Sequence, residues 1–360
     1  MIFRFFAYGT IFLLATVLLL SAWVIAQNLY SQHRERLLQA RRSRLRQELL
    51  AYLASKLNLE QLLPTLNNTA ELLTGVLSQV STQLSFEEKE KLLVLLNEPS
   101  MNAIIKRELK NLTSWHCRLR QQAATYLPYL CTTEKISGLL LMALSDRREE
   151  VKIAAAISLA QLQSINATTH IITCLAQVKT LPGSRVVEII LIMGEKAKES
   201  LLGILKDKQS TDEALSITIA CLAGLKVTEA SECIQGFSKE PDKNLRIQTM
   251  KALGVLHQPS ALGVLLEGLQ DSEWEVRAIC AKGLGNFQEA DAIPALEKYL
   301  GDPSYWVRFN CAQALSEHGT QGLSVLAKNL KSQDRFIRDV CTQMIQTAEM
   351  QATLAKEISL

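Results

Sequence analysis

The chain has 360 residues, of which 48% are hydrophobic and 6% aromatic, and it contains only 8 prolines. This composition provides ample apolar material for a core and favours helices over sheets. The net charge of +3 is unevenly divided, because residues 1–50 hold seven Arg and two Glu (+5), which leaves −2 for the rest. A slightly acidic body lacks the uncompensated Lys and Arg that nucleic acids require, so no nucleic-acid partner is expected.

The first predicted element is a transmembrane helix over residues 5–26. No charged residue occurs from Phe5 to Gln32, and about 22 residues at 1.5 Å each reach roughly 33 Å, enough to cross a bilayer. A cleaved signal peptide is the alternative, but the small residues Ser21 and Ala22 lie inside the apolar run rather than at its end.

The charges around this run predict its orientation. One Arg precedes it and six follow, so the positive-inside rule places the rest of the chain in the cytoplasm. The expected location is therefore the bacterial inner (cytoplasmic) membrane, with the repeat domain on the cytoplasmic side. Export of that domain to the periplasm is the alternative topology.

Residues 27–57 are predicted to form a basic juxtamembrane helix. Its apolar positions fit a short coiled-coil seam, which predicts self-association through residues 31–59; they are Leu38, Leu45, Leu49, Tyr52 and Leu59. Its arginines fit either an orientation signal on a solvated face or contact with anionic lipid headgroups. These arginines are Arg34, Arg36, Arg41, Arg42, Arg44 and Arg46.

Residues 58–113 are predicted to be an irregular helical cap or a degenerate repeat. Ser85 and Glu88 have the spacing of a capping box that opens a helix running to Leu96. The sequence Asn-Glu-Pro-Ser at 97–100 then interrupts the helix.

A unit of about thirty residues recurs over residues 114–348. The stretch 270–288 returns as 301–318 and, less clearly, as 333–345. A basic anchor recurs as Lys152, Arg246, Arg277, Arg308 and Arg338. An acidic residue lies six positions before an anchor at Asp146, Asp271 and Asp302, where its carboxylate is expected to cap a helix. Apolar or small residues at offsets −1, +3 and +7 form one stripe of a helix, and a second apolar run follows. Each unit is therefore a helical hairpin that must stack on its neighbours to bury its apolar faces.

The motif D-x-x-x-x-V-R-x-x-C/A-A-x-x-L-G at Asp271 and Asp302 resembles the HEAT-repeat family, particularly the short bacterial units also seen in phycobilin lyases. The resemblance implies an all-α fold, an α-solenoid of about seven to eight armadillo-like helical hairpins after the one N-terminal transmembrane helix. Residues 349–360 would end a capping helix. The units at Val186 and Ser216 depart from the motif, because they lack the basic anchor and the Asp.

Three columns of side chains in the repeats have alternative interpretations. The anchor arginines either pair with the Asp of their own or the next unit, which sets the register between repeats, or form an anion-binding stripe. Trp274, Trp306 and Phe336 either pack between neighbouring repeats or form a contact strip for a partner protein. Cys280, Cys311 and Cys341 share one register and are expected to be small buried hydrophobes rather than metal ligands.

The sequence contains no constellation typical of catalysis. Its five histidines are isolated, and it has no His-Glu dipeptide, phosphate-binding glycine loop or nucleophile elbow. We therefore expect a non-catalytic scaffold or adaptor that binds an unknown protein partner and holds no cofactor or metal. A lyase-type enzyme, or a subunit of one, is the alternative function.

Overall fold

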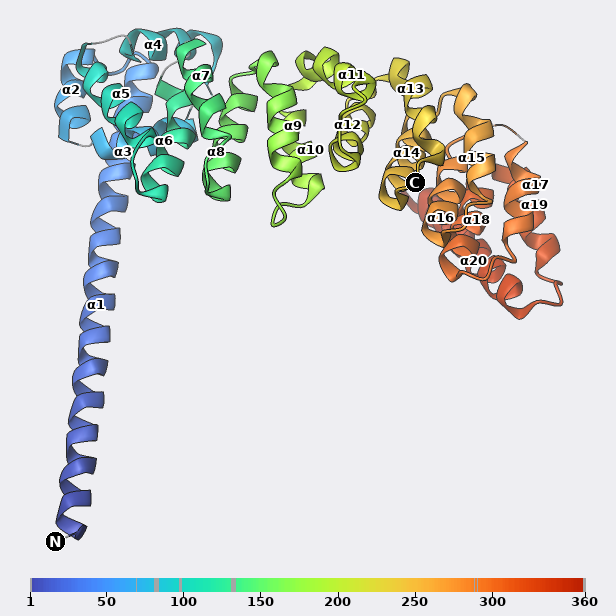
Figure 1. Ribbon diagram of the computed structural model, residues 1–360, viewed down its shortest axis with the longest axis horizontal. Helices are drawn as coiled ribbons and strands as arrows, with labels where there is room; N and C mark the ends of the chain where they lie inside the picture. Colours follow the sequence, from blue (N-terminus) through green and yellow to red (C-terminus); the bar gives the residue numbers. More distant parts are fainter. Residues whose placement is uncertain are drawn as a thin grey trace. The chain divides into compact units, whose positions relative to one another are not determined.

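A computed structural model describes the backbone of residues 2–68, 70–80, 84–96, 99–130, 134–287, 289 and 291–358 (Figure 1). Every regular element in these ranges is a helix, and none of them contains a strand. The predicted all-α fold is confirmed. The chain divides into two compact units, residues 1–136 and 137–360.

The first unit begins with α1 (Ile2–Leu53), a single rod drawn in blue in Figure 1. Among the described residues, no helix combines the length and the apolar character needed to cross a membrane. The predicted span of residues 5–26 lies largely outside the side chains that the structure describes, which begin at Leu19. The helix ends at Leu53, before the predicted boundary at 57, and Ser55 turns the chain with a φ of 58°.

The last three turns of α1 belong to the core of the first unit. They pack with α2 (Leu59–Asn68), α3 (Ala70–Val80), α4 (Phe86–Leu96), α5 (Pro99–Leu112) and α6 (Cys117–Leu130). Leu45 and Leu49 are fully buried there among leucines of the following helices. The prediction of self-association through residues 31–59 is wrong for Leu45 and Leu49. Helices of the same chain already bury both side chains, so they are not free to contact a second copy.

The capping box that opens α4 is confirmed. The Ser85 backbone N–H donates to Glu88 Oε2 at 2.8 Å, and the Glu88 N–H donates to Ser85 Oγ at 3.4 Å. The two side chains thus satisfy each other's orphan amides at the helix start. α4 is described to Leu96 and α5 from Pro99, and residues 97–98 of the predicted interruption lie outside the described residues.

The second unit is a stack of six described hairpins closed by a long helix, and α7 (Glu134–Ala143) spans the division before it. The first helices are α8 (Glu149–Gln161), α10 (Gly183–Leu191), α12 (Asp212–Gly224), α14 (Lys243–Leu256), α16 (Trp274–Leu284) and α18 (Tyr305–Glu317), and α20 (Arg335–Ile358) closes the stack. The second helices are α9 (Thr168–Ala176), α11 (Lys198–Lys206), α13 (Ser231–Gln235), α15 (Leu262–Gly268), α17 (Ala292–Tyr299) and α19 (Gly319–Asn329). Each first helix packs against the next first helix, which is the arrangement of a solenoid (Figure 1).

The predicted apolar stripe of the first helices is buried inside the stack. Val276, Cys280 and Leu284 on α16 are fully buried, and so are their counterparts on α18. Burial raises the pKa of the Cys280 and Cys311 thiols and raises that of Cys341 to about 11, so these thiols stay protonated at neutral pH. The cysteines of the stripe are packing residues, as predicted.

A glycine permits one unusually close helix crossing in the stack. A Cβ added at Gly254 on α14 would lie 2.8 Å from the Cα atom of Gly283 on α16. Real Cβ atoms essentially never approach that closely. Gly254 therefore permits the close crossing of α14 and α16.

Candidate functional site

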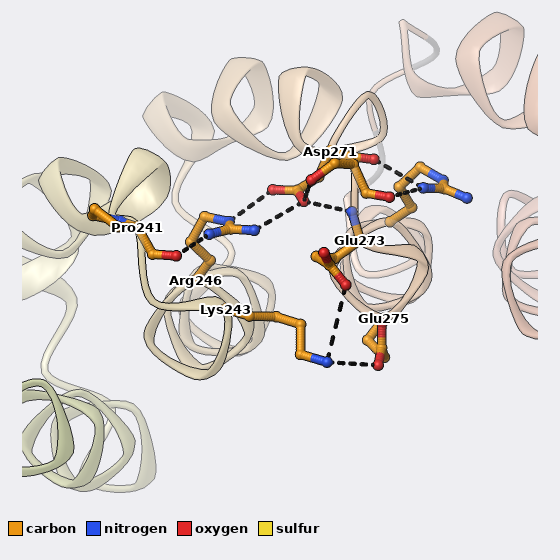
Figure 2. Close-up of polar contacts among 8 residues, drawn as sticks. Pro241, Lys243, Arg246, Asp271, Glu273 and Glu275 are labelled. Carbon is orange, nitrogen blue, oxygen red and sulfur yellow. Dashed lines mark hydrogen bonds and ion pairs between the residues drawn. The ribbon is translucent and has the colours of Figure 1, made fainter.

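Arginine–aspartate pairs join consecutive repeats of the second unit. Arg246 on α14 donates from Nε and Nη2 to Asp271 Oδ2 and Oδ1 at 2.8 and 3.2 Å (Figure 2). One repeat later, Arg277 donates in the same way to Asp302 at 2.8 and 3.1 Å. Of the two pairings considered from the sequence, the structure forms the one with the next unit. We call these two bidentate pairs the arginine ladder.

The same guanidinium groups also fix the turn before their own helix. In each case Nη1 donates to the carbonyl oxygens six and five residues earlier, at 2.7–3.0 Å. The acceptor pairs are Glu240 and Pro241 for Arg246, Asp271 and Ser272 for Arg277, Asp302 and Pro303 for Arg308, and Ser332 and Gln333 for Arg338. Arginine can bind an aspartate and the turn carbonyls at the same time, because its planar guanidinium has N–H donors along more than one edge. Lys152 has a compact ammonium, and no ion pair is formed by it within the described ranges.

The ladder aspartates do not cap helices as predicted. Asp271 Oδ1 accepts from the Glu273 N–H at 2.9 Å, and Asp302 Oδ1 accepts from the Ser304 N–H at 2.8 Å. Glu273 and Ser304 are themselves the N-cap residues of α16 and α18. Asp146 is placed in the same way before α8. The aspartates therefore shape the turn leading into the helix, two residues before its cap.

The pairing shifts the acidity of the ladder carboxylate. Burial by itself raises the pKa of Asp271, but the hydrogen bonds from Arg246 and from the Glu273 N–H outweigh it and hold that pKa below its usual value. The bond to Asp271 in turn raises the pKa of Arg246. Both shifts favour the charged pair.

This depressed pKa predicts an acid-dependent loss of stability in the second unit. A carboxyl group whose pKa is lower in the folded than in the unfolded chain contributes stability above the unfolded pKa of about 3.9 and loses it as the pH falls through the folded pKa. Urea unfolding from pH 6 to pH 2 should show a smaller acid-induced loss in Asp271→Asn than in the wild type. Asp212→Asn, which removes an exposed carboxylate from α12, is the control for charge. Identical pH profiles for wild type and Asp271→Asn would contradict the expectation.

The ladder stops at Arg308, although its helix and turn are in place. Ser332 occupies the position of the next carboxylate: its carbonyl oxygen accepts from Arg338 Nη1, and its Oγ accepts from the Asp334 N–H at 3.3 Å. Arg308 is only 9% exposed, and its Nε has no hydrogen-bond partner among the described residues. The guanidinium carbon lies 5.0 Å from the Phe336 ring centroid and 6.0 Å from that of Tyr305.

The three predicted strip aromatics lie at the starts of α16, α18 and α20 and face solvent. Trp274 is 41% exposed, Trp306 55% and Phe336 62%. Sequence reasoning missed two further rings: Tyr305, also exposed, and Phe309 contact Trp306 at centroid distances of 5.4 and 6.4 Å. The adjacent aromatic residues at the start of α18 could have indicated this cluster in the sequence. We keep the name aromatic strip for Trp274, Trp306 and Phe336.

A separate groove of about 660 Å³ lies along α10, α12 and α14. Its walls mix apolar side chains, such as Val187 and Val255, with the polar side chains of Asn244 and Gln248. Ser216, one of the two positions where the basic anchor is lost, lies on its floor. No group of His, Cys, Asp or Glu side chains in the described part of the chain could hold a metal ion.

The six arginines considered for contact with lipid headgroups, Arg34, Arg36, Arg41, Arg42, Arg44 and Arg46, are all exposed on α1. Arg44 pairs with Glu48 at 2.8 Å along the same helix. An exposed face is compatible with both interpretations of these arginines, so contact with lipid headgroups stays a prediction.

Comparison with known proteins gives a family match for part of the chain. A family model described as HEAT repeats matches residues 262–346, which contain α15 to α19 and part of α20. No curated protein matches the chain.

Several solved structures are similar at low identity. The complex of CpcE and CpcF of phycocyanin lyase from Nostoc sp. PCC7120 is 20% identical, with a TM-score of 0.31, and the match covers 62% of this chain and 92% of that chain. Human deoxyhypusine hydroxylase is 16% identical, with a TM-score of 0.26 and coverage of 70% and 98%. Computationally designed armadillo repeat proteins are 18% identical, with a TM-score of 0.34 and coverage of 59% and 99%. At these scores the likenesses carry no argument about activity or partners. The family match, within a helical stack joined by Arg–Asp pairs, identifies residues 262–346 as HEAT repeats.

Proposed function

We propose that this protein is a membrane-anchored, non-catalytic scaffold or adaptor that binds a partner protein along the aromatic strip. The observation that carries the proposal is the exposure of Trp274, Trp306 and Phe336 at the starts of α16, α18 and α20. Large aromatic side chains anchor protein interfaces, whereas soluble surfaces seldom expose several of them together. A stack of helical hairpins offers the extended surface that such binding uses.

The anchor in this proposal rests on the sequence. The charge-free run from Phe5 to Gln32, followed by six arginines, supports an inner-membrane anchor with the repeats on the cytoplasmic side. Attachment would confine the repeats to the membrane surface and raise the local concentration of whatever they bind. A C-terminal reporter that is active only in the cytoplasm tests this topology, and activity of a periplasm-specific reporter would reverse it.

The non-catalytic part of the proposal is supported by the use of the polar groups in the repeats. Arg246 and Arg277 are engaged with turn carbonyls and with the next repeat. The cysteines of the apolar stripe, Cys280, Cys311 and Cys341, are buried, and burial raises the pKa of each thiol. Turnover of a substrate by the purified protein, or a chromophore retained on it, would favour the lyase-type alternative instead.

Replacing one aromatic residue of the strip tests partner binding directly. Trp306→Ala should reduce the recovery of a copurifying protein from detergent-solubilised membranes by at least ten-fold, because losing a central aromatic anchor costs about 2 kcal/mol or more. Trp115→Ala is the matched control, since Trp115 is 79% exposed but lies in the first unit. Equal recovery with both variants would remove the aromatic strip from the proposal.

A further inference from the structure

We infer that Arg308 and the rings beside it form a receptor for a carboxylate of the partner protein, supplied by an acidic side chain or a chain end. The inference rests on the proposed function, because it names the chemistry recognised at the aromatic strip. The proposed site comprises the Nε and Nη2 edge of Arg308, with Trp306 on the same helix and Phe336 on the next.

The two preceding rungs of the ladder show what this arginine edge binds. In Arg246 and in Arg277, Nε and Nη2 hold the two oxygens of one carboxylate at 2.8–3.2 Å, while Nη1 holds the turn. Arg308 reproduces the Nη1 contacts, to Asp302 O at 2.7 Å and Pro303 O at 3.0 Å. The Arg308 guanidinium therefore has the same orientation as those of Arg246 and Arg277. Its Nε and Nη2 form the edge that binds a carboxylate in the other two arginines.

Among the described residues, no partner is bonded to Arg308 Nε. Ser332 lies where the next carboxylate would be, and its hydroxyl already accepts from the Asp334 N–H. Neighbouring carboxylates are bonded elsewhere: Asp302 to Arg277, Asp339 to Arg335 at 3.4 Å, and Asp334 to the Phe336 N–H at 2.8 Å. A buried cation with an unpaired N–H is costly. A carboxylate from outside would remove that cost.

The aromatic rings suit this role. Phe336 covers the guanidinium at 5.0 Å and is itself 62% exposed, so a rotation of its side chain would uncover Nε for an incoming oxygen. The rings also keep water away from the ion pair, which strengthens charge-assisted hydrogen bonds. A planar carboxylate with a single charge matches both the geometry and the charge of the ladder rungs.

The test uses Ser332→Asp, which supplies the missing carboxylate from the chain itself. The full-length protein in detergent is titrated with an octaglutamate peptide, and the Nε–H signals of Arg308 and Arg277 are followed by NMR. We expect the Arg308 signal to shift saturably while the Arg277 signal stays in place, because Arg277 already holds Asp302. Ser332→Asp should weaken binding at least ten-fold and also stabilise the fold. Octaglutamine should not bind.

A control variant and a competing ligand make the test specific. Ser324→Asp adds the same charge at an exposed position of α19 and should leave binding unchanged. An Arg308 signal that does not shift, or equal affinity in Ser332→Asp, would overturn the inference. Tighter binding of inorganic phosphate than of octaglutamate would also overturn it, since it would assign the site to phosphate.

Recovery of the copurifying partner protein distinguishes failure of this inference from failure of the proposed function. If Trp306→Ala abolishes partner recovery and Ser332→Asp does not, the aromatic strip stands and the carboxylate receptor is refuted. If Trp306→Ala leaves recovery unchanged, the aromatic strip is refuted as the partner's surface, whatever octaglutamate does at Arg308.

Discussion

Asp302→Ala is expected to lower the unfolding free energy of the second unit by about 3–5 kcal/mol, because removing one partner of a buried ion pair leaves the other charge uncompensated. The Asp302 side chain is 3% exposed and that of Arg277 15%. The substitution also removes the acceptor for the Ser304 N–H at the start of α18. Denaturant unfolding monitored by helical circular dichroism measures the effect.

Ser332→Ala is the matched control for this loss. Ser332 has the same place in the next turn and its hydroxyl accepts the corresponding N–H, but that hydroxyl bonds to no arginine side chain among the described residues. Its replacement should cost about 1 kcal/mol or less, as expected for one exposed hydrogen bond. Similar losses for the two variants would mean that the turn, rather than the ion pair, holds the repeats together.

In the first unit, Leu49→Ala is expected to cost about 2–5 kcal/mol, because it opens a cavity in a closely packed leucine core. Leu49 is fully buried against α2, α3 and α4, and the adjacent Leu50 is 39% exposed. Leu50→Ala should therefore have little effect. Limited proteolysis of the first unit during thermal unfolding distinguishes the two variants. Equal resistance would show that the end of α1 does not contribute to the core.

The helical hairpins could be predicted from the sequence because burial repeats with the pitch of a helix. Offsets of −1, +3 and +7 mark side chains that must face a neighbour, and Val276, Cys280 and Leu284 do so. The same logic failed at Leu45 and Leu49, since a heptad-like spacing shows that a face is covered but not by which chain. The chain's own α2 to α4 cover it.

The candidate site was predicted only in part. The Arg and Asp columns were visible because both partners are side chains at fixed spacing. The contacts of Nη1 with turn carbonyls were not predicted, since backbone acceptors occur at every position and leave no pattern of residue types. The role of Asp302 was misjudged for a related reason: aspartate is favoured both at a helix cap and in the turn just before it.

The direction of the ladder bonds affects how such a chain can grow. Each ladder arginine binds an aspartate in the next repeat toward the C-terminus. Each ladder aspartate is therefore bound by an arginine of the preceding repeat. A block such as residues 271–301 carries one of each, so a tandem copy would complete a new junction without any further substitution. A copy of residues 180–209 would not, because Thr180 and Val186 occupy the positions of the ladder aspartate and arginine. Gene duplication could therefore lengthen this protein most readily within its C-terminal third.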